Sequence, residues 1–185
     1  MLIARGFTRQ KICKMLENYK IRHATREDCA EIKKLIQELA DFENCSSGPK
    51  LSVEDLQRDG FDSVPQKFSC LVVEETTVEK DGCLCGYLIY FPTYSTWEGA
   101  SLRMEDLYVS PAHRKNGLGR LLICHLAKEA EEKGCRRIDF SVLTWNPAIT
   151  FYKSMGAQNI SDLEQWAMWR FDKDAIKELA EKAKN

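Results

Sequence analysis

The stretch from residue 102 to residue 143 constrains the fold more than any other part of the sequence. An apolar run at 102–109 leads into a basic turn, and an amphipathic pattern at 118–133 then ends at Gly134. A second apolar run follows at 137–143. Two strands joined through a crossover helix are parallel and right-handed in nearly all known sheets. The sequence therefore predicts a mixed α/β fold.

Further elements are predicted on both sides of this stretch. Alternating or continuous apolar residues predict strands near 20–22, 68–74, 86–92 and 166–171. Helical spacing predicts helices from Thr25, with Asp28 as capping partner, to about residue 43, from Ser52 to Gly60, from Asn146 to Gly156, and over 172–184. Asp81-Gly82 predicts a hairpin turn. The expected order is β-α-α-β-β-β-α-β-α-β, with a helix closing the chain.

Composition limits the class of protein. With 185 residues, 44% of them hydrophobic and 30% charged, the chain fits one globular domain. The net charge of −1 argues against a generic nucleic-acid binder, which usually carries a basic excess. Its apolar runs are much shorter than the roughly 20 residues that a membrane-spanning helix needs. We therefore expect neither nucleic acid nor membrane as a partner.

The eight cysteines lie at positions 13, 29, 45, 70, 83, 85, 124 and 135. Cys70 and Cys124 fall within apolar or helical stretches, which predicts reduced, buried thiols. Cys83 and Cys85 form a close pair, but no second pair or histidine follows at zinc spacing, so we expect no metal site. The default compartment for such thiols is the reducing cytoplasm.

Residues 1–18 differ from the rest of the chain. They carry four basic residues and one acid, Glu17. A basic, acid-poor start is compatible with a mitochondrial transit peptide. Because the segment is short and has a single hydroxylated residue, Thr8, we favour a flexible extension ahead of one domain at 19–185.

Residues 105–119 carry the chemically most informative pattern. A strand ends at Pro111, a basic turn with Arg114 and Lys115 follows, and Gly117 and Gly119 open the next helix. Glycines allow a ligand close to the backbone, and the first N–H groups of a helix attract anions, so this turn suits a pyrophosphate. It has neither the Gly-Lys-Ser/Thr end of a Walker loop nor the three glycines of a dinucleotide fingerprint. On spacing alone, a tight turn that caps a helix is equally possible.

A resemblance to a known family extends this interpretation. The pattern Val-x-Pro-x-x-Arg-x-x-Gly-x-Gly at 109–119 resembles the coenzyme A pyrophosphate loop of the GNAT acetyltransferase superfamily. The block at 146–157, Asn-Pro-Ala-Ile-Thr-Phe-Tyr-Lys-Ser-Met-Gly-Ala, is similar to that family's second motif. The resemblance implies the GNAT fold, an α/β fold with a mixed, twisted sheet that splays between two parallel strands and has helices on both faces. It also implies acetyl-CoA as the acetyl donor.

Shorter motifs narrow the resemblance. Residues 21–29, 35–40, 59–61, 94–99 and 105–106, with Glu164-x-Trp166, resemble the spermidine/spermine (diamine) acetyltransferases, over roughly residues 20–175. Asp41-Phe42-Glu43 looks more like the thialysine acetyltransferase branch, since the polyamine branch has Lys-Tyr-Glu there. The implied activity is acetylation of the primary amine of a small cationic metabolite, thialysine-like or a diamine.

The resemblance also implies catalytic roles. Glu105 matches the family's base, which removes the amine proton through water, and Tyr152 matches the acid that protonates the coenzyme A sulfur. A base is needed because deprotonating an amine of pKa near 10.4 at pH 7 costs about 4–5 kcal/mol. The alternative interpretations are that Glu105 is an ordinary surface glutamate and that Tyr152 packs in the core. Strand alternation predicts that Asp106 points to the other face from Glu105. No cysteine matches an acyl-transfer position, so we expect direct transfer in a ternary complex.

The remaining site residues are implied by the same resemblance. Those expected to bind the coenzyme are Leu107, Tyr108, Val109, Arg114, Lys115, Asn116, Gly117, Leu118, Gly119, Arg120 and Asn146. Those expected to bind the amine are Phe42, Glu43, Glu105, Asp139, Phe140, Ser141 and Glu164. Asn146 before a proline is alternatively a helix N-cap. Taken one at a time, each acidic residue among these is most simply a solvated surface residue. Together, however, they would attract a cation.

Other interpretations stay open at this level. One is an acetyltransferase for protein N-termini or lysines, and another is a catalytically silent acyl-CoA-binding module. The family resemblance implies a homodimer, although no apolar stripe in the sequence indicates one.

Overall fold

The computed structural model describes residues 18–77 and 82–183. The chain divides into two compact units, one up to Ser141 and one from Val142, and each is described by itself. The predicted extension at 1–18 lies almost entirely outside the described residues. No helix in the described ranges has the length and apolar character needed to cross a membrane.

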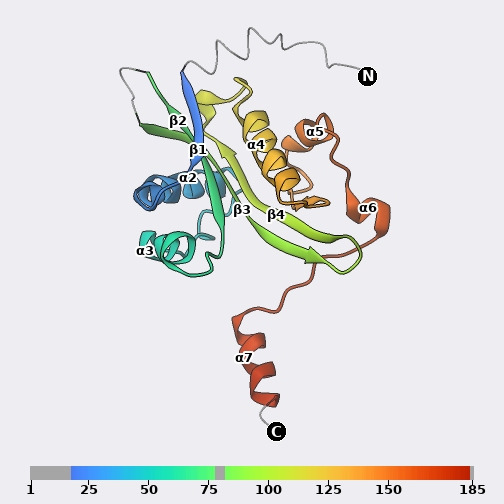
Figure 1. Ribbon diagram of the computed structural model, residues 1–185. Helices are drawn as coiled ribbons and strands as arrows, with labels where there is room; N and C mark the ends of the chain where they lie inside the picture. Colours follow the sequence, from blue (N-terminus) through green and yellow to red (C-terminus); the bar gives the residue numbers. More distant parts are fainter. Residues whose placement is uncertain (1–17, 78–81, 184–185) are drawn as a thin grey trace. The chain divides into compact units, whose positions relative to one another are not determined.

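The first unit is built on one five-stranded sheet in the order β1-β2-β3-β4-β5 (Figure 1). Its strands are β1 (Tyr19–His23), β2 (Ser69–Glu75), β3 (Cys83–Ser95), β4 (Gly99–Val109) and β5 (Ile138–Phe140). The first four pair antiparallel in sequence order, whereas β5 lies parallel to β4. This confirms the predicted mixed sheet and the parallel crossover. β5 is shorter than the predicted strand at 137–143.

The helices of the first unit start at the predicted caps. They are η1 (Arg26–Asp28), α2 (Cys29–Phe42), α3 (Val53–Gln57), the π-helical turn η2 (Arg58–Asp62), η3 (Pro111–His113) and α4 (Leu118–Glu132). Asp28 accepts a hydrogen bond from the Thr25 N–H at 2.7 Å, and Ser52 and Asp55 form a reciprocal capping box. The second helix continues past Gly60 as η2 rather than ending there, because this glycine lets the backbone pass under Phe68, whose ring lies 2.5 Å from where a Cβ would stand.

Helices cover both faces of this sheet, as Figure 1 shows for α2 and α4. On one face, Ile32 and Leu35 of α2 belong to the same buried cluster as Tyr87 and Ile89 of β3. On the other, the Tyr90 hydroxyl donates to Glu129 of α4. Consecutive strand residues point to opposite faces, so β3 separates the two halves of the core.

The cysteine predictions are confirmed only in part. Cys70 is a buried free thiol on β2, whereas Cys124 is exposed on α4. The buried positions of α4 are Leu118, Leu122, Leu126 and Ala130, spaced by four residues, and Cys124 falls on the other side of the helix. Apolar neighbours in the sequence therefore did not fix its orientation. Cys13 lies outside the described residues.

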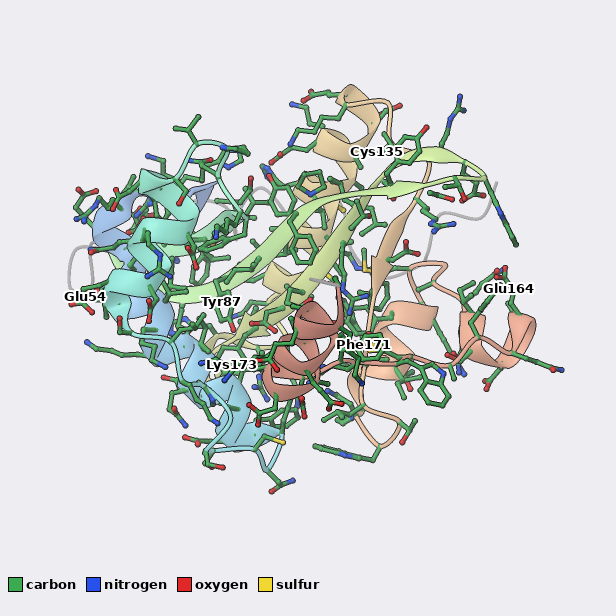
Figure 2. The ribbon with its side chains drawn as sticks, turned by 90° about the horizontal axis from the view of Figure 1, so that it is seen from below. Glu54, Tyr87, Cys135, Glu164, Phe171 and Lys173 are labelled. Carbon is green, nitrogen blue, oxygen red and sulfur yellow. The ribbon has the colours of Figure 1, made fainter. Side chains whose placement is uncertain are left out.

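The second unit contains α5 (Ala148–Lys153), α6 (Ile160–Glu164) and α7 (Lys173–Lys182). The strand predicted at 166–171 is wrong, since the segment between α6 and α7 has no regular structure. Its Trp169 and Phe171 are 91% and 70% exposed, and Figure 2 shows Phe171 in this segment. Alternating apolar residues suit a strand, but a strand needs a hydrogen-bonding neighbour, and no described residue of this unit forms one.

Candidate active site

The connection from β4 to α4 builds an anion-binding turn. Lys115 and Gly117 both have left-handed backbone conformations, at φ 63° and 81°, which fold the turn tightly before α4 begins. The Leu121 N–H donates to the Gly117 carbonyl at 3.0 Å, so the N–H groups that precede it in the first turn have no intrahelical acceptor. This turn holds no acidic residue. The arrangement fits a phosphate group.

The sheet opens next to this turn. β5 pairs with β4 only from Leu102 to Met104, opposite Ile138 to Phe140. From Glu105 to Val109, the outer edge of β4 has no strand partner among the described residues. Unpaired backbone N–H and C=O groups on such an edge can bind an extended ligand as an added strand would.

A β-bulge lies at the point where the two strands part. In the register with β3, Ile89 faces Asp106 and Tyr90 faces Met104, which leaves Glu105 without a partner on β3. The bulge breaks the strict alternation that predicted Asp106 on the opposite face from Glu105, and that prediction is wrong. Asp106 faces Ile89 and Arg103 faces Phe91, so these two side chains lie on one face, and Glu105 bonds to Arg103 there.

Asp106 is the buried member of a group of carboxyls. The Tyr87 hydroxyl donates to its Oδ2 at 3.0 Å. Burial above all raises the pKa of Asp106 to about 6, the carboxylates of Glu105 and Glu43 add to this rise, and the Tyr87 hydrogen bond opposes it. Burial also raises the pKa of Glu43, which caps the C-terminus of α2. This side of the sheet therefore holds closely spaced negative charge.

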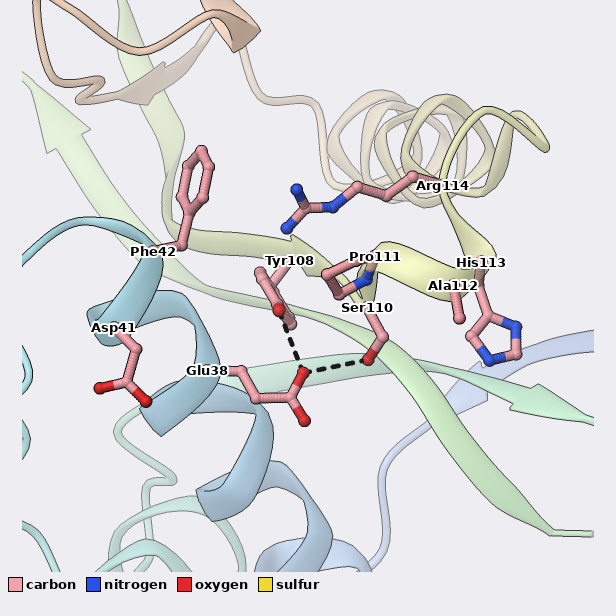
Figure 3. A pocket seen from close by; sticks show the side chains of 9 residues that line it. All are labelled: Glu38, Asp41, Phe42, Tyr108, Ser110, Pro111, Ala112, His113 and Arg114. Atoms are coloured by element: carbon pink, nitrogen blue, oxygen red, sulfur yellow. Dashed lines mark hydrogen bonds between the residues drawn. The ribbon is translucent and has the colours of Figure 1, made fainter.

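A pocket of about 550 Å³ lies between the end of α2 and the start of the turn (Figure 3). It is lined by Glu38, Asp41, Phe42, Tyr108, Ser110, Pro111, Ala112, His113 and Arg114. Glu38 accepts hydrogen bonds from the Tyr108 hydroxyl at 3.0 Å and the Ser110 hydroxyl at 3.2 Å. These bonds connect α2 to β4 and to the residue just before the turn.

Arg114 reaches back across the same pocket. Its Nε donates to the Val109 carbonyl at 2.8 Å, and its guanidinium carbon lies 5.1 Å from the centre of the Phe42 ring and 5.3 Å from that of Tyr108. Figure 3 shows the side chain extending from the turn toward Phe42. The two aromatic rings hold a positive charge beside the anion-binding turn.

Comparison with known proteins shows the family to which the chain belongs. The acetyltransferase (GNAT) family matches the chain over residues 33–157. The chain belongs to the GNAT family. It is an N-acetyltransferase, and acetyl-CoA is its acetyl donor. The turn before α4, the basic side chains next to it and the open edge of β4 fit the phosphates and the extended arm of that donor.

Several relatives cover most of the chain. A thialysine N-epsilon-acetyltransferase of Bos taurus is 42% identical over 166 residues, which are 88% of this chain and 97% of the relative. The human spermidine/spermine N(1)-acetyltransferase-like protein 1 is 36% identical over 168 residues, 89% of this chain but 24% of that longer protein. An integron cassette protein from the mobile metagenome of V. cholerae shares the fold, with a TM-score of 0.65, 23% identity, and coverage of 88% of this chain and 98% of that one.

The residues implied by the GNAT motifs divide between the two units. In the first unit, Phe42, Tyr108 and Arg114 meet around one pocket. Glu105 and Ser141 are joined through one side chain, that of Arg103. Asp139 belongs to neither of these two sets of contacts and accepts a hydrogen bond from Arg137. The roles of all these residues in binding and catalysis stay predictions.

Asn146, Tyr152 and Glu164 belong to the second unit. The Asn146 side chain accepts a hydrogen bond from the Ala148 N–H at 2.9 Å, which supports its alternative role as a cap of α5. Tyr152 is half-buried beside the ring of Phe151, at 5.2 Å between centroids. Glu164 accepts a hydrogen bond from the Trp166 indole at 3.1 Å. Their predicted roles toward coenzyme and amine stay predictions.

Sequence reasoning assigned no role to Glu38 or Arg103. Glu38 precedes Phe42 by one helical turn, so helical spacing could have placed both on the side of α2 that faces the turn. Arg103 lies two residues before Glu105 on β4, and a period of two places both on one face. The bulge at Glu105 left no sequence signal, since neither glycine nor proline marks it.

Asp106 leads to a prediction about stability. An unfolded aspartate has its pKa near 3.8, and the folded value is about 6, so the folded protein holds this proton more tightly. Stability from this group is full below pH 4 and is lost as the pH rises through 6, by about 3 kcal/mol. We expect Asp106→Asn, which cannot ionise, to raise the free energy of unfolding by up to that amount at pH 8. Urea unfolding from pH 4 to pH 8 measures it.

The matched control is Asp139→Asn, whose carboxylate on β5 is 41% exposed. This variant should follow the parent protein at every pH. An Asp106→Asn protein with the parent's stability at pH 8, or with an advantage that does not shrink toward pH 4, would contradict the assignment of a buried, proton-holding carboxyl.

Proposed function

We propose that this enzyme acetylates the terminal primary amine of a small cationic metabolite, with thialysine-like amino acids first and diamines or polyamines second. The observation that carries this proposal is the 42% identity to a thialysine N-epsilon-acetyltransferase across nearly the whole of both chains. The carboxyls of Glu43, Glu105 and Asp106 support it, because their combined charge favours a cationic acceptor.

In the proposed mechanism, Glu105 acts as the base. It takes a proton from the acceptor ammonium, through water, and so produces the neutral amine that can attack the thioester carbonyl. The carbon–nitrogen bond forms and the carbon–sulfur bond breaks within one ternary complex, and the nitrogen loses its second proton to water as the amide forms. Tyr152 gives its proton to the departing thiolate and regains one from solvent. No acyl-enzyme forms, so the acetyl group passes directly from sulfur to nitrogen.

We further propose how the donor binds. The N–H groups from Gly117 to Arg120 hold its pyrophosphate, with charge from Arg114 and Lys115. The free edge of β4 from Leu107 to Val109 pairs with its pantetheine arm. Asn146 is a further candidate for contact with the donor.

Assembly and compartment are also proposals. We expect a homodimer, as the family resemblance implies. The free thiols among the described residues, several of them exposed, favour the reducing cytoplasm.

Thiol release from acetyl-CoA tests the proposed function. Thialysine, lysine, spermidine, putrescine and a histone-tail peptide are offered in parallel at one concentration. We expect turnover with thialysine and weaker turnover with the diamines. Turnover with the peptide alone would show a protein acetyltransferase instead. Tight coenzyme A binding in a calorimeter without any thiol release would show a silent acyl-CoA-binding module.

A further inference from the structure

Arg103 lies on β4, opposite Asp139 of β5. Its Nε donates to Oε2 of Glu105 at 3.2 Å, and its Nη2 donates to the Ser141 hydroxyl at 3.0 Å. Both bonds use the side edge of the guanidinium. Its other edge, formed by Nη1 and the second hydrogen of Nη2, has no recorded partner among the described residues. The side chain as a whole is 26% exposed.

This arginine stands where the charge of the site is otherwise negative. Glu105, Asp106 and Glu43 interact electrostatically in one region, as expected of a site for a cation. A purely cationic acceptor, such as a diamine, would be repelled by a guanidinium next to the base. An acceptor with an anionic group at its far end would instead be held by it, in the end-on geometry that arginine offers to carboxylates.

We propose that Arg103 binds the carboxylate of the acceptor, so that the enzyme selects ω-amino acids over diamines of the same length. This inference rests on the proposed function and names the acceptor class within it. Because the guanidinium is hydrogen-bonded to Glu105, an amino acid whose amine meets Glu105 through water has its far end near Arg103. With the amine at Glu105, the carboxylate of such a molecule reaches the free edge of Arg103.

Ser141 and Glu105 position the guanidinium for this task. The two hydrogen bonds fix the side edge, one from β4 and one from the residue after β5, and so leave the free edge in a single orientation. A guanidinium held in advance loses less entropy when it binds a carboxylate. The α-ammonium of the amino acid is bonded to the same α-carbon as the carboxylate. It therefore lies close to the negatively charged side chains of the site.

The test compares thialysine with its carboxamide, which differ only in the carboxylate. Thiol release gives kcat/KM for each substrate with the wild type, Arg103→Gln and Arg103→Lys. We expect the wild type to prefer the acid over the amide by about 10- to 100-fold, Arg103→Gln to lose this preference, and Arg103→Lys to keep part of it. The expected loss is in the kcat/KM for the acid, with the affinity for coenzyme A unchanged in a calorimeter.

Arg137→Gln is the matched control, because Arg137 also bridges two carboxylates on this side of the sheet, those of Glu98 and Asp139. It should keep the wild-type preference. If Arg103→Gln lowers the rates for acid and amide equally, Arg103 only supports Glu105, and the inference is overturned while the proposed function stands. If the wild type releases no thiol with any amine, the proposed function fails and this inference fails with it.

Discussion

Glu105→Gln is expected to lower kcat for amine acetylation by about 100-fold or more, because general-base catalysis contributes factors of this size. The glutamine keeps the length of the side chain and can still accept the hydrogen bond from Arg103 Nε. It cannot take a proton from the acceptor ammonium. Only the small neutral fraction of the amine would then react, so activity should recover partly as the pH rises toward the pKa of the amine. Thiol release between pH 7 and pH 9.5 measures this.

Glu98→Gln provides a close control. Glu98 and Glu105 are almost equally exposed, at 51% and 52%, and each bonds to an arginine side chain. Glu98, however, lies at the turn between β3 and β4, away from the bulge. Its replacement should leave kcat and its pH profile unchanged. A Glu105→Gln enzyme with the wild-type rate at pH 7 would remove Glu105 as the base and direct attention to Asp106.

The parts of the fold that the sequence predicted are those set by local rules. The caps at Thr25 and Ser52, the start of α4 at Leu118, and the parallel relation of β4 and β5 all follow from residue types at fixed spacing. Each depends on interactions within a few residues, or on the handedness of one crossover. Such features need no knowledge of distant parts of the chain.

The features that were missed depend on pairing between distant segments. Whether residues 166–171 form a strand is decided by a neighbouring strand edge, which no pattern within the segment encodes. The bulge at Glu105 arises from the register between β3 and β4, and without it Asp106 would point away from Glu105. The predicted catalytic glutamate was thus identified by its motif, whereas its carboxyl neighbours and Arg103 became visible only when the strands were paired.

The phenol of Tyr152 leads to the second large prediction. Tyr152→Phe is expected to lower kcat by about 100-fold or more, since it removes the proposed proton donor to the thiolate. The ring itself stays, and with it the packing against Phe151. The dissociation constant for coenzyme A should therefore be unchanged in a calorimeter, which separates loss of the acid from loss of donor binding.

Tyr94→Phe controls for the loss of a phenol as such, because Tyr94 is 77% exposed near the β3–β4 turn. Its rate should match the wild type. The hydroxyl and the base act at different atoms in the proposed reaction, so Glu105→Gln should respond to rising pH through the amine while Tyr152→Phe should not. At pH 7 a thiol of pKa near 8.5 ends the reaction protonated, so the leaving sulfur must take up one proton. A Tyr152→Phe enzyme at the wild-type rate would mean that water, rather than this residue, protonates the leaving sulfur.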